Sequence, residues 1–152
     1  MLWSQGIAHF CDFAGPDWYR NAPTESTQSE AFFRDHYGGA HGIVWVRLST
    51  LAREGRNCDL DTFARVVLPT IKAPFILLTT DGDASVPSDL AKDTVERLLA
   101  NPYLVSWYSQ NSDGGHPRIK PFPIGLDLHT PRSFATPAGL VRQLQTLRDR
   151  QG

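Results

Sequence analysis

The stretch Pro74-Phe-Ile-Leu-Leu-Thr-Thr-Asp81-Gly-Asp83 joins an apolar run to two carboxylates one residue apart. A short apolar run of this kind predicts a buried strand over residues 75–80. Open α/β sheets bind ligands at the carboxyl ends of their strands, and hard divalent cations prefer oxygen ligands. We therefore expect Asp81 and Asp83 to lie at the edge of a sheet and to share a Mg²⁺ or Mn²⁺ ion.

The residues around these carboxylates allow two interpretations. Gly82 permits a tight turn that points both carboxylates at one spot, and the hydroxyls of Ser85 and Ser88 near a helix start suit an anion such as phosphate. Asp and Gly are also common in strand-to-helix connections that have no functional role, where solvated aspartates cap the next helix. A cation site and a solvated turn are both open from the sequence.

The rest of the chain alternates strands with helices. Residues 42–48 predict a strand with Ile43, Trp45 and Arg47 on one face. Further along we expect a helix from Asp59 to Pro69, one after a Ser88 cap, and a last one from 136, with strands over 103–108 and 119–124, the last irregular or at an edge. This order predicts an α/β fold, a Rossmann-like three-layer unit with a small, mainly parallel sheet.

The domain organisation follows from the same pattern. Residues 1–40 are irregular, with a short helix over 29–36, and are expected to pack on the sheet as an amino-terminal segment. Residues 41–152 form the Rossmann-like α/β domain. At 152 residues the chain is long enough to bury a hydrophobic core without disulfide bonds or a structural metal ion, so we expect one compact domain overall.

Composition excludes several classes of function. The chain has 15 basic and 16 acidic residues in no single stripe, which argues against nucleic-acid binding. Cys11 and Cys58 lack zinc-site spacing and indicate free thiols in a reducing compartment. Neither a signal peptide nor a membrane span of about 18 apolar residues is present, so we expect a cytoplasmic protein.

A second polar cluster follows the predicted strand over residues 103–108. Trp107 offers a flat apolar face that suits a sugar ring, and Gln110 and Asn111 can donate to and accept from sugar hydroxyls. A tryptophan beneath a polar turn is also a common core residue. The cluster therefore predicts a substrate-binding surface, with a core role as the alternative for Trp107.

Other candidates lie in loops or at strand ends. His116 in a Gly-rich loop is a candidate general base or phosphate contact, and Lys120 a candidate phosphate contact. Asp127 is a candidate ligand, base or turn former. Arg47 is a candidate bidentate phosphate contact or a structural salt-bridge partner.

The order of these motifs resembles that of proteins described as glycosyltransferases, some of them exostosin-like. The shared features are the 74–83 stretch, Trp107-Tyr-Ser-Gln-Asn111, His116-Pro-Arg118 and Pro123-Ile-Gly-Leu-Asp127, over roughly residues 40 to 130. The resemblance implies a Rossmann-type sheet and a nucleotide-sugar donor. Enzymes with two such domains are about twice this length or more, so a second domain or subunit is an expected partner.

The sequence therefore predicts a glycosyltransferase-type domain that transfers a glycosyl group to a glycan or small-molecule acceptor. Asp81, Asp83 and His116 are the candidate catalytic residues. One alternative is a phosphatase of the haloacid-dehalogenase type, with Asp81 as nucleophile, Asp83 as acid/base, and Ser106 and Lys120 in supporting roles. The other is a non-catalytic carbohydrate- or nucleotide-binding module.

Overall fold

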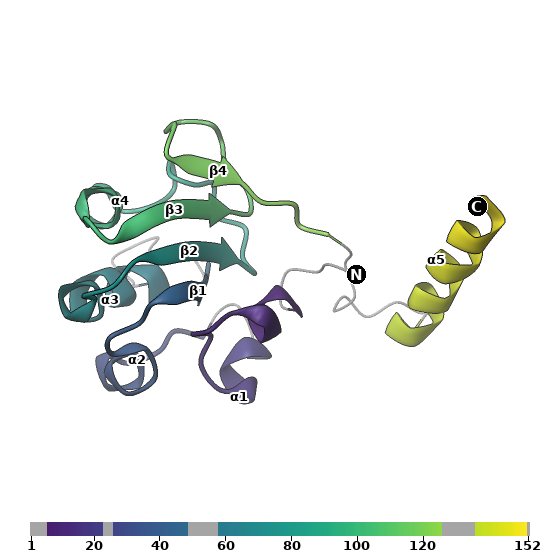
Figure 1. The fold of residues 1–152 in the computed structure, drawn as a ribbon, viewed down its shortest axis with the longest axis horizontal. Helices are drawn as coiled ribbons and strands as arrows, with labels where there is room; N and C mark the ends of the chain where they lie inside the picture. The colour runs from purple at the N-terminus through teal and green to yellow at the C-terminus, as the bar shows by residue number, and fades with distance from the viewer. Residues whose placement is uncertain (1–5, 23–25, 49–57, 126–135, 152) are drawn as a thin grey trace.

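The computed structural model describes residues 6–22, 26–48, 58–125 and 136–151 (Figure 1). The helices are α1 (Asp17–Arg20), α2 (Glu30–Tyr37), α3 (Asp59–Val66), α4 (Lys92–Ala100) and α5 (Pro137–Gln151), with 3₁₀ turns η1 (Gly6–Phe10) and η2 (Leu68–Thr70). The strands are β1 (Gly42–Arg47), β2 (Phe75–Thr80), β3 (Leu104–Ser109) and β4 (Ile119–Pro121). None of the described helices is both long and apolar enough to cross a membrane.

The four strands form one sheet in the order β1-β2-β3-β4, and every pair is parallel. The predicted α/β, Rossmann-like architecture is therefore confirmed. Right-handed crossovers between neighbouring parallel strands place successive helices on the same face of a sheet. Accordingly α3 packs between α2 and α4, and the three helices form one row beside the sheet (Figure 1).

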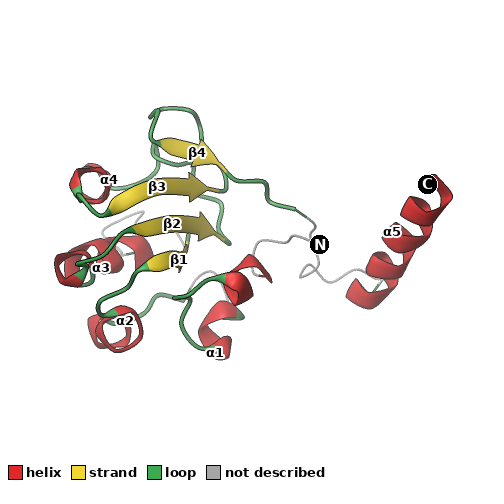
Figure 2. Cartoon of the chain, viewed as in Figure 1, coloured by secondary structure: helices red, strands yellow, loops and turns green. Residues whose placement is uncertain are grey.

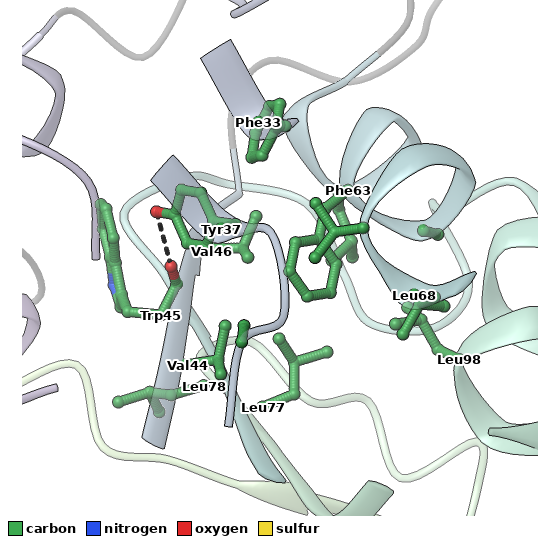
Figure 3. Packing of buried hydrophobic residues seen from close by; sticks show 14 of the residues in the cluster. Phe33, Tyr37, Val44, Trp45, Val46, Phe63, Leu68, Leu77, Leu78 and Leu98 are labelled. Atoms are coloured by element: carbon green, nitrogen blue, oxygen red, sulfur yellow. Dashed lines mark hydrogen bonds between the residues drawn. The ribbon is translucent and has the colours of Figure 1, made fainter. Parts of the chain in front are cut away.

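Strand alternation divides β1 between two faces. Val44 and Val46 are fully buried on the side of α3, where Figure 3 shows Val46 directed toward Phe63. Trp45 projects from the opposite face and contacts the ring of Tyr19 in α1 at a centroid distance of 5.7 Å. Successive side chains of a strand point to opposite faces, so both faces of β1 are covered by apolar groups.

The amino-terminal segment closes the outer edge of β1. The Phe13 N–H donates to the Ile43 carbonyl, and the Trp45 N–H donates to the Phe13 carbonyl. The Asp12 carboxylate accepts from the Ile43 N–H at 2.8 Å. An open strand edge is a template for unwanted pairing, and these bonds occupy that edge of β1. The predicted helix over residues 29–36 is confirmed as α2, whose N-cap is Ser29.

The starts of two helices differ from the prediction. α3 is capped by Cys58 rather than Asp59, through a capping box in which the Cys58 N–H donates to the Asp61 carboxylate. α4 begins at Lys92 and not after Ser88. Residues 86–90 instead form turns, because Val86 pairs with Ser112 of the β3–β4 connection. The helix N-terminus expected beside Ser88 for anion binding is therefore displaced along the chain.

The edge of the sheet beyond β3 follows the prediction more closely. β4 is short and lies at the edge, consistent with Pro121 and Pro123, which lack the N–H needed in a central strand. β3 begins one residue later than expected, and the register shifts near Phe75 so that Ile76 faces Ser106.

Candidate functional site

The strand ends lie level at the carboxyl edge of the sheet. Arg47 pairs with Thr80 across β1 and β2, and the Gln110 N–H donates to the Thr79 carbonyl across β2 and β3. The residues that follow β2 and β3 therefore emerge side by side, which confirms the expected convergence of the backbone at one edge.

The turn formed by residues 81–83 is tightly constrained. Asp81 has φ 64°, a left-handed conformation that Asp adopts more readily than most residues. A Cβ placed on Gly82 would lie only 1.5 Å from the Leu48 carbonyl oxygen, so only glycine fits. The side chain of Asp81 is buried with 4% of its surface exposed, whereas Asp83 is exposed. The two predicted metal ligands thus have unequal access to solvent.

Gln110 and Asn111, which directly follow the neighbouring strand β3, hold this turn. Both amide nitrogens donate to the Gly82 carbonyl, Gln110 Nε2 at 3.1 Å and Asn111 Nδ2 at 3.0 Å. Gln110 Oε1 accepts from the Asp81 N–H at 3.1 Å. Gln110 and Asn111 therefore lie beside the 81–83 turn, as the sequence predicts. Their side-chain amides, however, form hydrogen bonds to the backbone of that turn.

Trp107 lies below this edge, inside the core. It has no exposed surface, and its indole N–H donates to the Thr79 hydroxyl at 2.9 Å. Thr79 is joined in turn to the Ser109 hydroxyl at 2.9 Å. A sugar ring has no access to Trp107, so the core interpretation that the sequence left open applies and Trp107 does not line the site.

Arg47 also points away from the 81–83 turn. Its guanidinium is fully buried, lies 3.6 Å from the Asp59 carboxylate, and donates to the Ala22 carbonyl at 2.6 Å and to the Ser26 carbonyl at 2.9 Å. It also stacks over the ring of Tyr19. The structural salt bridge, and not a phosphate contact, is what the arrangement supports for Arg47.

Asp59 is the partner that the sequence did not assign to Arg47. Its other hydrogen bonds come from the Tyr19 hydroxyl at 3.1 Å and the Gln28 N–H at 2.7 Å. Burial raises the pKa of Asp59, against the opposing effect of the Gln28 N–H and of Arg47. Its position at the start of α3, the helix that follows β1 in the chain, was the signal available for this pairing.

The remaining candidates lie elsewhere. His116 is half-buried beside α4, where its Nδ1 accepts from the Arg118 N–H. Lys120 is exposed on β4 and donates to the Ser106 hydroxyl at 3.3 Å. Asp127 lies outside the described residues. The structure thus joins Asp81, Asp83, Gln110 and Asn111 and separates His116 and Lys120 from them.

The Ser106–Lys120 pair bears on the phosphatase alternative. Ser106 is level with Ile76, five residues before Asp81 along β2. At about 3.3 Å per residue, Ser106 lies roughly 16 Å along the strand from the proposed nucleophile. The backbone of Lys120 is level with Leu78, but its ammonium group is directed back to Ser106. Such a distance is too long for direct contact with a phosphate on Asp81, so these two residues do not support that mechanism.

The metal-ligand set at the edge is small. Within the described part of the chain, no group of three or more His, Cys, Asp or Glu side chains is placed to hold a metal ion. Mg²⁺ often needs only one or two carboxylates, with substrate phosphates and water completing its shell. At this edge the 81–83 turn offers one exposed carboxylate, that of Asp83, beside the buried Asp81.

Comparison of the chain with protein-family models, curated proteins and solved structures finds no significant match.

Proposed function

We propose that this protein is a glycosyltransferase-type domain that binds the diphosphate of a nucleotide sugar at the carboxyl edge of its sheet. The observation that carries the proposal is the 81–83 turn, which presents an exposed carboxylate just beyond the inner strand β2 and is fixed by the amide side chains of Gln110 and Asn111, which directly follow β3. A rigid turn at this edge is preorganised for a ligand, because little freedom remains to be lost on binding.

Mg²⁺ or Mn²⁺ would be bound together with the donor. Asp83 supplies the accessible carboxylate, and Asp81, being buried, contributes mainly by shaping the turn. In a glycosyl transfer the oxygen of the acceptor hydroxyl forms a bond to the anomeric carbon and releases its proton to water, while the bond between the anomeric carbon and the diphosphate breaks. A bound cation would stabilise the charge that develops on the leaving phosphate. The acceptor is a glycan or a small molecule with a free hydroxyl.

The test is calorimetric titration with a panel of uridine and guanosine diphosphate sugars, with and without Mn²⁺. We expect one donor class to bind, and binding to require Mn²⁺. Asp83→Asn should weaken the Mn²⁺-dependent affinity at least about tenfold, because one of few cation ligands is lost. Asp35→Asn, at an exposed site on α2, is the matched control and should bind as the unmodified protein does.

Two outcomes would overturn the proposal. One is the absence of binding across the panel in the presence of Mn²⁺. The other is hydrolysis of an aryl phosphate that Asp81→Asn abolishes, which would favour the phosphatase instead.

A further inference from the structure

The segments that follow β2 and β3 each contain an Asp-Gly pair, Asp81-Gly82 and Asp113-Gly114. An aspartate before glycine is the one whose side-chain carboxyl the main chain attacks most easily, because glycine has no side chain to hinder the approach of its nitrogen. The first pair belongs to the candidate site. The second lies in the connection from β3 to β4, residues 110–118, which Figure 2 shows without a helix.

The reaction of such a pair needs no enzyme and no reactant other than water. The glycine nitrogen forms a bond to Cγ of the protonated aspartic acid, the bond from Cγ to the hydroxyl breaks, and the hydroxyl leaves as water with the proton of that nitrogen. The product is a five-membered succinimide ring. Water then opens the ring at Cγ, which restores aspartate, or at the main-chain carbonyl carbon, which gives isoaspartate with the main chain passing through Cβ.

The fold protects the Asp81-Gly82 pair from this reaction. The Asp81 side chain is buried, and its N–H donates to Gln110 Oε1. The Gly82 carbonyl accepts from the amides of Gln110 and Asn111, and the Leu48 carbonyl fills the space beside the Gly82 Cα. Ring closure reorients the 81–82 peptide group, so it requires these contacts to break in a local unfolding step.

The Asp113-Gly114 pair has the opposite surroundings. Both residues are exposed, and a Cβ added to Gly114 would meet no atom within 4 Å. Within the described residues, no hydrogen bond involves the Gly114 N–H. Asp113 Oδ1 accepts from the Gly115 N–H at 2.8 Å, so the carboxyl group is folded back across the Gly114 peptide group. This turn holds the carboxyl carbon near the nitrogen that attacks it, which favours ring closure.

We propose that Asp113-Gly114 is a site of spontaneous isoaspartate formation and that the fold prevents the same reaction at Asp81-Gly82. Isoaspartate lengthens the main chain at this position by one methylene group and leaves an exposed carboxylate on a new branch. The chemical class of enzyme that acts on such a group is a methyltransferase that esterifies isoaspartyl carboxylates. This inference is independent of the proposed activity.

The modification has a structural consequence for the loops at this edge of the sheet. In the unmodified chain the Asp113 carboxylate accepts from the Ser88 N–H at 3.0 Å as well as from Gly115. A carboxylate displaced by the longer main chain no longer matches both donors. The aged chain is therefore expected to be less stable than the fresh one.

Ageing of the full chain at physiological temperature tests the proposal, with a second sample kept unfolded in guanidinium chloride. Peptide mapping with electron-transfer fragmentation locates isoaspartate, because it cleaves the Cα–Cβ bond that isoaspartate places in the main chain. In the folded sample isoaspartate should form at position 113 at least about tenfold faster than at position 81. In the unfolded sample the two positions should react at similar rates, since the fold no longer distinguishes them.

A pair of glycine variants separates the local chemistry from stability. Gly114→Ala adds a side chain beside the attacking nitrogen and should slow the reaction at position 113 at least about fivefold. Gly39→Ala is the matched control, because Gly39 also has a positive φ and open space around it, and it should leave that rate unchanged. Equal rates at positions 81 and 113 in the folded protein would overturn the proposal. So would a folded chain in which position 113 stays aspartate, or a Gly114→Ala variant that reacts as fast as the unmodified protein.

Discussion

β1 and β2 are neighbours in the sheet and both lead into charged residues, yet the two ends have opposite surroundings. The Arg47 guanidinium at the end of β1 is fully buried against Asp59. Asp83, just beyond the end of β2, is exposed. Removing a charge from water costs several kcal/mol, so the end of β1 is committed to structure while the end of β2 can serve a ligand.

The amino-terminal segment makes the difference. Carbonyl groups of Tyr19, Ala22 and Ser26 accept hydrogen bonds from Arg47, so residues far earlier in the chain cover the end of β1. At the end of β2 the turn is held instead by Gln110 and Asn111, the two residues that directly follow β3. The end of β1 is thus covered by the amino-terminal segment, whereas the turn after β2 is held by hydrogen bonds from the residues that follow β3.

Arg47→Met should have the largest effect. It leaves the Asp59 carboxylate buried without its cation and frees several carbonyls, so the free energy of unfolding should fall by about 3–5 kcal/mol. Chemical denaturation measures this loss. Arg97→Met breaks the exposed pair with Asp93 and should cost less than about 1 kcal/mol.

A double variant sharpens the same test. Arg47→Met combined with Asp59→Asn removes both charges; the amide oxygen can still accept from the Gln28 N–H, and the amide nitrogen can donate to the Tyr19 hydroxyl oxygen. It should be more stable than Arg47→Met alone, since no unpaired charge remains buried. Equal stability of the two variants would mean that Arg47 acts through packing and not through its charge.

Gly82→Ala should have the second largest effect. The added Cβ would meet the Leu48 carbonyl, so the ends of β1 and β2 must separate, at a cost of about 3 kcal/mol. Gly114→Ala is the matched control, because Gly114 has a positive φ but a Cβ added there would meet no atom within 4 Å. That control should lose only about 1 kcal/mol, from backbone strain. Thermal unfolding of both variants decides whether close approach at the turn is what matters.

The fold could be predicted from the sequence where patterns are local. The apolar run at residues 75–80 and the alternation in residues 42–48 give β2 and β1 nearly to the residue. The predicted start of α4 is wrong, because the turns at 86–90 depend on pairing of Val86 with Ser112, a contact between segments that local patterns do not contain.

The candidate site was predictable only in its backbone. Parallel topology places Arg47, Asp81 and Gln110 at one edge, and the sequence reveals that topology. Whether a side chain faces solvent depends on what covers it. The sequence left open whether Trp107 lies in the core or faces a ligand; the structure buries it fully, with its indole N–H bonded to Thr79 of β2.

Asp113→Asn should have the smallest effect. It tests the solvent-exposed loops that follow β2 and β3. Hydrogen bonds from Ser88 and from the Gly115 N–H lower the pKa of the exposed Asp113 carboxyl. A lowered folded-state pKa means that Asp113 stabilises the protein above its ordinary pKa of about 3.9, and that this contribution is lost as the pH falls through the folded-state value. The unfolding free energy of the unmodified protein should thus fall more steeply between about pH 5 and pH 3 than that of Asp113→Asn.

Amide exchange locates the source of that difference. In the unmodified protein the Ser88 and Gly115 amides should exchange slowly at about pH 5 and faster, relative to the intrinsic rate, at about pH 3. In Asp113→Asn the pH dependence of their protection should disappear, since an amide side chain does not titrate in this range. If both proteins lose stability equally on acidification, the loops after β2 and β3 are held together by their backbone pairing at Val86 and Ser112, and the Asp113 charge plays no part.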